Sequence, residues 1–277
     1  MHVTLDTNIF GPLISPADYP NHAAATDLAA IAHSIAQGTI GASISQASLS
    51  LEALDRHTRV DKFFREWATK TSGITLPRPA GVRAAIFQRA FASGLTALHV
   101  PRLALAHFVD VPASAWAPDT RHSQLNRHGR SCQFMRDYPE AGPRQLKTLG
   151  AELVALHAID CSRVLWSPGW PAREEFLWLK GIVAEYDRPR KFASTEVFSR
   201  HLRDLIAEWT DIDILASHYG YGLDLFCTLD TGRNRGTGGV LHANNRPHLQ
   251  SRYGIEIVSP EDLLERLPST PRASGPR

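Results

Sequence analysis

The sequence predicts an α/β fold, a parallel sheet flanked by helices, with a mainly helical insertion. Two observations support this. Residues 1–58 alternate strand, helix, strand and helix, and the alternation returns between residues 205 and 267. Such alternation is expected of a parallel sheet covered by helices. We therefore assign 1–58 and 205–267 to one core, 59–204 to the insertion, and 268–277 to a disordered tail.

The first strand and helix follow from periodicity. Val3 and Leu5 alternate with polar neighbours and stop at Asp6, which predicts a short strand that delivers a carboxylate to its end. Apolar residues recur at helical spacing over residues 23–37, and Gly38 stands where a helix C-cap is expected.

The second strand is predicted over residues 39–45, where "TIGASIS" alternates. It runs into "QASLSLEALDR", residues 46–56, where the apolar positions have helical spacing and Glu52 lies on the flank of the apolar stripe. These four elements complete the first strand and helix alternation.

The insertion contains segments with helical character, 62–70, 81–95 and 172–186, separated by loops rich in proline and glycine. It also contains a basic run from Arg121 to Lys147 with interleaved histidines and few acids. Such a run predicts either a surface that holds phosphates or an ordinary solvated basic face.

The C-terminal elements are a helix over residues 202–222, strands over 223–230 and 253–259, and a helix from Pro260, a residue tolerated at the first helical position. Asp230 therefore ends a strand, as Asp6 does.

Composition narrows the class of protein. The chain has 277 residues, 43% hydrophobic and 21% charged, a net charge of +2, and no apolar run near the roughly 18 residues of a membrane span. The first residues form a strand, so we expect no secretory signal. The three cysteines are widely spaced and odd in number, which favours reduced thiols and a cytoplasmic location. We expect a cytoplasmic protein without a membrane span.

The carboxylates suggest a metal site. Carboxyl ends of adjacent parallel strands converge on one crevice, and Asp6 and Asp230 both follow such ends. Glu52 and Asp211, near the starts or on the flanks of helices, would lean toward the same edge. Because clustered carboxylates repel and raise one another's pKa, a divalent cation would resolve the conflict. Oxygen ligands without histidine or thiolate favour Mg²⁺ or Mn²⁺.

Phosphodiester hydrolysis is the chemistry that such a site supports. The metal would lower the pKa of a bound water and neutralise charge at the scissile phosphate, while arginines and lysines outside the acidic floor would position the nucleic acid.

Several motifs resemble the PIN domain, a nuclease family that includes the toxin ribonucleases of bacterial toxin and antitoxin pairs. They are "LDTNIF", "SLSLEAL" around Glu52, "DIDILASHYGYGLDLFCTLD" and "YGIEIVSPEDLLERL". The resemblance covers about residues 1–58 and 205–267 and implies helices on both faces of a parallel sheet. It also implies that Mg²⁺ or Mn²⁺ is bound by Asp6, Glu52, Asp211 and Asp230. The small toxins lack so long a middle segment.

The family pattern in the C-terminal run is matched without a gap by Asp211, Ala216, Gly222, Asp224, Thr228 and Asp230. Alternatives stay open at each position. Asp213 competes with Asp211, Asp55 with Glu52, and turn formation alone is a common use of Asp6 and Asp230. Asn8 and Thr228 either orient the metal ligands or are ordinary turn and strand residues.

The sequence thus predicts a metal-dependent endoribonuclease that acts on RNA. The alternatives are a structure-selective DNA nuclease, since both substrates present the same phosphates, and a catalytically silent nucleic-acid-binding module of the same fold. An antitoxin or other protein partner and a homo-oligomer are left open.

Overall fold

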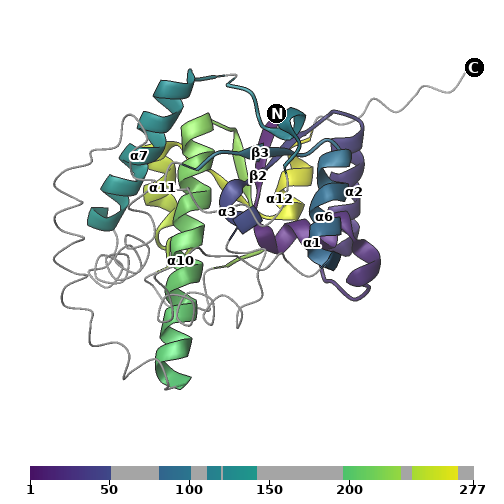
Figure 1. The fold of residues 1–277 in the computed structure, drawn as a ribbon, viewed down its shortest axis with the longest axis horizontal. Coiled ribbons are helices and arrows are strands. Elements are labelled where there is room, and N and C mark those ends of the chain that lie inside the picture. The colour runs from purple at the N-terminus through teal and green to yellow at the C-terminus, as the bar shows by residue number, and fades with distance from the viewer. Residues whose placement is uncertain (51–80, 101–110, 120, 142–195, 232–238, 268–277) are drawn as a thin grey trace, which may run out of the picture.

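The computed structural model describes residues 1–50, 81–100, 111–119, 121–141, 196–231 and 239–267. Within these ranges the chain builds one five-stranded sheet, and every strand pair in it is parallel. The strand order is β3-β2-β1-β4-β5. The strands are β1 (His2–Leu5), β2 (Gly41–Ser45), β3 (Thr96–Leu98), β4 (Leu225–Cys227) and β5 (Ile257–Val258). The predicted α/β class with a parallel sheet flanked by helices is confirmed (Figure 1).

The strand order places a topological switch between β1 and β4. The chain adds β2 and β3 on one side of β1 and then returns to add β4 and β5 on the other. In the resulting register Leu5 pairs with Cys227. The backbone N–H of Asp6 then donates to the carbonyl of Cys227 at 3.0 Å. Open parallel sheets bind ligands outside the carboxyl ends of their strands at such a switch.

Each face of the sheet has its own apolar core, because side chains alternate along a strand. Leu225 and Cys227 join one cluster, while Phe226 between them joins the other. The first cluster contains residues of α1 (Thr7–Ile14), α2 (Ala25–Ala36), α6 (Gly81–Ala92) and α12 (Pro260–Glu265). The second contains residues of α3 (Gln46–Ser50), α7 (Gln124–Ala141), α10 (Glu196–Tyr221) and α11 (Arg246–Tyr253). Figure 1 shows these two helical layers on either side of the sheet.

Helix ends agree with the sequence signals. The helix predicted over 23–37 is α2, and Gly38 follows it with φ 71°, a conformation that glycine adopts without strain. Pro260 occupies the first turn of α12, and Ser259 caps that helix through a reciprocal pair of hydrogen bonds with Asp262. Two short 3₁₀ turns, Pro16–Asp18 and Ala113–Ala115, lie between the larger elements.

The sheet takes one strand from the segment that the sequence assigns to a mainly helical insertion. β3 pairs with β2, and the preceding α6 contributes Ile86 and Phe87 to the core. The helix predicted over 81–95 ends at Ala92. Three residues are too few to show the alternation by which a strand is recognised, so β3 was missed. The predicted helices over 62–70 and 172–186 and the tail 268–277 lie outside the described residues.

Two further expectations concern the thiols and the membrane. Cys132 and Cys227 are buried, and the Sγ of Cys132 lies 3.6 Å from Nε2 of His128, while Cys161 lies outside the described residues. Within the described ranges, no helix combines the length and apolar character that a bilayer span requires.

Replacement of Ile44 by alanine tests the core. Ile44 lies in β2 and is 1% exposed, so I44A should lower the free energy of unfolding by about 2–5 kcal/mol. Leu125, on α7 and 73% exposed, supplies the control, since L125A should change it by less than about 0.5 kcal/mol. Urea unfolding measures both, and equal effects would contradict the described burial.

Candidate functional site

Asp6 ends β1 and caps α1, and its carboxylate accepts hydrogen bonds from the two residues that follow it and from a residue 222 positions away. Its Oδ1 accepts from the backbone N–H of Thr7 at 2.7 Å. Its Oδ2 accepts from the Asn8 amide at 2.8 Å and from the Thr228 hydroxyl at 2.6 Å. The side chain is buried, with 4% exposed. These bonds offset the desolvation of the carboxylate and fix its orientation.

Thr228 joins the two carboxylate segments. Its hydroxyl donates to Asp6 and accepts from the Asn8 amide at 3.1 Å and from the backbone N–H of Asp230 at 2.9 Å. A hydroxyl has one donor and two acceptor positions, so this one is fully used. The Asn8 carbonyl oxygen also accepts from the N–H of Leu229 at 3.1 Å. Asp6 and the backbone of Asp230 therefore belong to one network at the switch between β1 and β4.

The Asp230 segment is also held from the opposite side. Arg246, at the start of α11, donates through Nη2 to the Asp230 carbonyl at 2.7 Å and through Nε to the Leu241 carbonyl at 3.2 Å. The sequence identifies Arg246 only as one of several basic residues near the C-terminal motif. Its partner lies 16 positions away, and no local pattern links a side chain to that carbonyl.

Cys227 lies beside this network, and its thiol is not activated as a nucleophile or a metal ligand. Burial, together with the carboxylates of Asp6 and Asp262, raises the pKa of the Cys227 thiol to about 12. The thiolate is the form that attacks or binds metal. Cys227 therefore stays protonated near neutral pH.

The third predicted ligand lies in a long helix. Asp211 and Asp213 belong to the interior of α10, so Asp211 is not near a helix start as the sequence suggested. Both are buried, with 6% and 1% exposed, and so is almost every side chain from Thr210 to His218. α10 packs against α3 and β2. Burial does not distinguish the two acids.

The four predicted carboxylates thus have different outcomes. The Asp6 carboxylate and the backbone N–H of Asp230 both bond to the Thr228 hydroxyl, while Asp211 lies in α10. Glu52 and its alternative Asp55 fall outside the described residues. Considering only the part of the chain that the structure describes, no three His, Cys, Asp or Glu side chains form a group suited to hold a metal ion.

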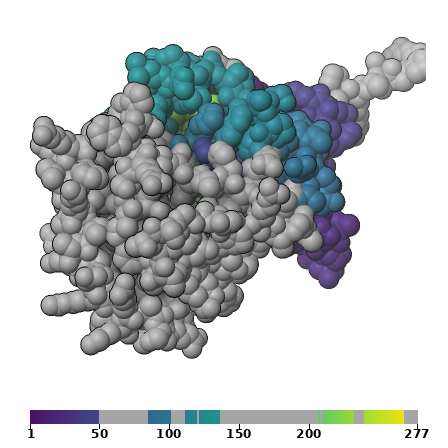
Figure 2. Space-filling view, viewed as in Figure 1, coloured from purple at the N-terminus to yellow at the C-terminus, as the bar shows by residue number. Residues whose placement is uncertain are grey.

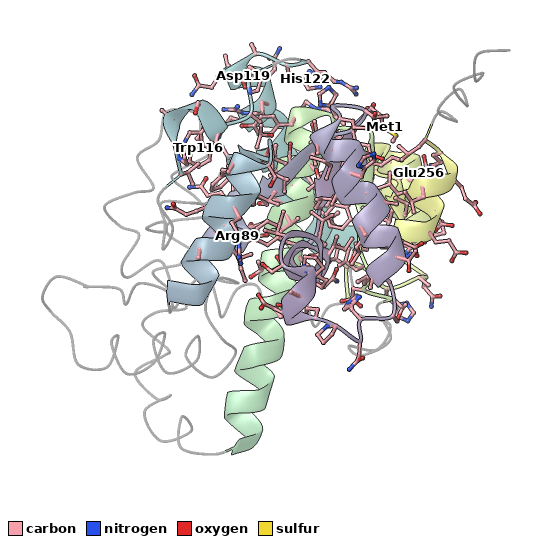
Figure 3. All side chains as sticks on the ribbon, turned by 90° about the vertical axis from the view of Figure 1, so that its right-hand side faces the viewer. Met1, Arg89, Trp116, Asp119, His122 and Glu256 are labelled. Carbon is pink, nitrogen blue, oxygen red and sulfur yellow. The ribbon has the colours of Figure 1, made fainter. Side chains whose placement is uncertain are left out.

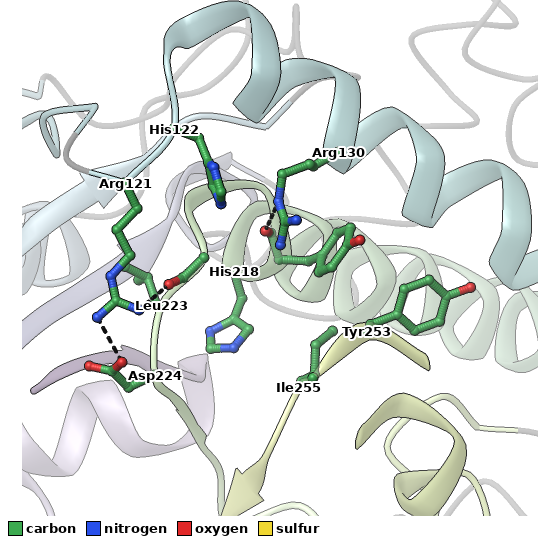
Figure 4. A pocket seen from close by; sticks show the side chains of 11 residues that line it. Arg121, His122, Arg130, His218, Leu223, Asp224, Tyr253 and Ile255 are labelled. Carbon is green, nitrogen blue, oxygen red and sulfur yellow. Dashed lines mark hydrogen bonds and ion pairs between the residues drawn. The ribbon is translucent and has the colours of Figure 1, made fainter. Parts of the chain in front are cut away.

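A separate cavity of about 390 Å³ lies at the amino ends of β4 and β5, opposite the Asp6 edge (Figure 4). Its walls come from the residues that precede α7, from α7 itself, from the end of α10, and from the turns that enter β4 and β5. The lining includes Arg121, His122, Arg130, His218, Asp224 and Tyr253. Three of these belong to the basic run that the sequence analysis identified.

His218 is a buried member of this lining that sequence reasoning set aside. One ring nitrogen, Nδ1, lies 2.9 Å from the Thr4 hydroxyl of β1. The other, Nε2, makes no hydrogen bond to any described residue. Burial lowers the pKa of His218 to about 3, with a smaller opposing effect from Asp224. The ring is therefore neutral in the folded protein at physiological pH.

No family model, curated protein or solved structure matches the chain.

Replacement of Thr228 by valine tests the connection between the two segments. T228V removes one donor to Asp6 and the acceptor of the Asp230 N–H, so the free energy of unfolding should fall by about 1–3 kcal/mol. T228S keeps the hydroxyl and loses one methyl, worth about 0.8 kcal/mol. Urea unfolding should show the valine variant as the less stable, and the reverse order would refute the role of the hydroxyl.

His218 should make stability depend on pH. The folded pKa of about 3 lies below the ordinary 6.5. The unfolded chain therefore binds a proton at this residue that the folded protein does not bind. The free energy of unfolding consequently falls as the pH drops below about 6.5. From pH 7 to pH 5, titration of His218 should lower the free energy of unfolding by about 2 kcal/mol. H218Q cannot titrate and should lose correspondingly less stability over that interval. Exposed His33 supplies the control, because H33Q should keep the wild-type slope.

Proposed function

We propose that the protein is a metal-dependent nuclease that hydrolyses phosphodiester bonds, with RNA as its substrate. The observation that carries the proposal is the Asp6, Asn8, Thr228 and Asp230 network at the switch point of a parallel sheet. The ligand crevice of such sheets lies at this edge.

The donor set suits a hard cation. The Asp6 carboxylate accepts hydrogen bonds from Thr7, Asn8 and Thr228, and an ionised carboxylate is a hard oxygen ligand. The Asn8 and Thr228 bonds hold it in one orientation, which is how residues behind a metal ligand commonly act. Mg²⁺ and Mn²⁺ prefer such oxygen ligands. We infer that Asp6, Asp230, Asp211 and Glu52 would hold the ion. When bound, it would acidify a water and neutralise charge on the scissile phosphate.

The remaining residues would hold the site and the substrate. Thr228 and Arg246 fix the backbone of Asp230 from two sides, through its N–H and its carbonyl. Arg246 also adds a positive charge beside the acidic edge, where a phosphate of the substrate would pass. The resemblance of the sequence motifs to PIN domains supports the same chemistry, and toxin and antitoxin pairing is a part of that resemblance that we leave as a proposal.

Cleavage of a short labelled RNA tests the proposal. We expect the protein to cut it with Mn²⁺ or Mg²⁺ and to stop on addition of EDTA. D6N and D230N should each slow cleavage about 100-fold or more, because electrostatic stabilisation by the metal is worth several kcal/mol. They should also weaken Mn²⁺ binding measured by calorimetry. Exposed Asp18 supplies the matched control, and D18N should cleave like the wild type.

DNA of the same sequence separates the alternatives. Cleavage of DNA alone would support a DNA nuclease, and binding of both nucleic acids without cleavage under any divalent metal would support the silent module. Activity that survives EDTA or D6N would refute the metal-dependent mechanism.

A further inference from the structure

The cavity at the amino ends of the strands is lined by a guanidinium with free donors. Arg130 donates through Nε to the carbonyl of Tyr219 at 3.1 Å, and its guanidinium carbon lies 4.0 Å from the centroid of the Tyr219 ring. Both contacts fix the plane of the group. No described residue accepts a hydrogen bond from its two terminal nitrogens. A half-buried guanidinium held in this way is prepared for a ligand that accepts hydrogen bonds.

Asp224, the acid in the lining, already has hydrogen-bond donors that neutralise its charge. Asp224 accepts from Arg121 at 2.7 Å and from the backbone N–H of His2 at 2.8 Å. Burial raises the pKa of Asp224, but these two donors outweigh it and lower that pKa below its usual value. Arg121 also donates to the carbonyl of Gly222 at 2.6 Å. Asp224 therefore balances Arg121, and the charge of Arg130 stays in excess.

His122 adds a third nitrogen group to the same wall. Burial and the charges of Arg130 and Arg121 lower its pKa, and the two guanidiniums place positive charge on the same wall. His122 packs closely on Gly222, because a Cβ at that glycine would lie 2.9 Å from the His122 ring. Figure 4 shows His122 and Arg130 side by side above the cavity, with His218 deeper inside.

The cavity is open to the exterior beside a surface segment. Residues 111–119 and the beginning of α7 lie at the surface, teal at the top of Figure 2. Met1 and His122 lie at the same end of the molecule in Figure 3. Asp6 lies at the other end of β1, whose four residues span roughly 13 Å at about 3.3 Å each. The cavity is therefore separate from the proposed cleavage site.

We propose that this cavity binds a phosphate monoester. Arg130 would give paired hydrogen bonds to the phosphate oxygens, His122 would give a third, and the compensated Asp224 would not repel the ligand. A volume of about 390 Å³ exceeds the needs of a phosphate ion and leaves space for the group that carries it. The rings of Tyr219 and Tyr253 line that space. The phosphate could belong to a mononucleotide or to the 5′ end of an RNA strand.

Calorimetry with inorganic phosphate on the full chain, against chloride at equal ionic strength, tests the site. We expect binding that R130Q weakens about 10- to 100-fold, since hydrogen bonds to a charged group are lost. Arg89 supplies the matched control because it lies on α6, far from His122 in Figure 3, and bonds to Ser15. R89Q removes the same charge and should bind phosphate like the wild type. Absence of phosphate binding, or equal binding by R130Q and the wild type, would overturn the proposal.

The source of the phosphate is resolved by two further ligands. A mononucleotide and a 5′-phosphorylated tetranucleotide should each compete with inorganic phosphate if it enters the site, and either competition supports the proposal. A 5′-hydroxyl tetranucleotide should not compete. Equal competition by the hydroxyl and phosphorylated strands would overturn the monoester site.

Two readouts keep this proposal independent of folding defects and of the nuclease proposal. In the wild type, phosphate should shift the imidazole NMR signals of His122 and leave those of exposed His33 unchanged; signals that move together, or do not move, count against the site. R130Q should still cleave 5′-hydroxyl RNA, and D6N should still bind phosphate. Failure of one activity therefore leaves the other measurable.

Discussion

The parallel pairing of β1 with β4 is the constraint on which both proposed sites depend. It places Asp6 against a segment 222 positions away, where the hydroxyl of Thr228 can reach the carboxylate. At the other end of the same pair, the backbone N–H of His2 reaches the carboxylate of Asp224, also 222 positions away. Apolar residues hold the pair together, since Val3 and Leu5 of β1 and Leu225 of β4 lie in one buried cluster. A shift of one residue would reverse every side chain of the strand and would dismantle both edges.

The polar groups are bonded differently at the carboxyl and amino edges of the sheet, and this difference indicates what each edge could bind. At the carboxyl edge, Asp6 and Thr228 are engaged in a dense network of hydrogen bonds, so the anionic oxygens are fixed in place. At the amino edge the acid is compensated, while Arg130 keeps terminal donors without a described acceptor. Unused donors in a partly buried cavity favour an anion.

Local patterns in the sequence predicted the parts of the molecule that depend on neighbouring residues. The strand that ends at Asp6, the glycine cap after α2 and the proline start of α12 each rest on a few adjacent positions, and all three are confirmed. Asn8 and Thr228 bond to Asp6, a contact across 222 positions in the case of Thr228 that no local pattern predicts. β3 was missed because three residues carry no periodicity, and the contact of Arg246 with the Asp230 carbonyl requires knowledge of the loop path. His218 was not singled out, because in a chain with 13 histidines one of them falls near a motif by chance.

Residues 210–218 of α10 are buried on every side. For this reason helical periodicity could not decide whether Asp211 or Asp213 is the predicted metal ligand. A surface helix has one apolar face, and an acid on the opposite face is then explained by solvent. Around Thr210 to His218 the helix is covered on all sides, so both acids are buried although they lie on different sides of it. Two carboxylates in such a position need compensating charge or hydrogen bonds, wherever they point. Full burial of this stretch therefore removes the solvent-facing side by which helical periodicity would separate an exposed acid from a buried one.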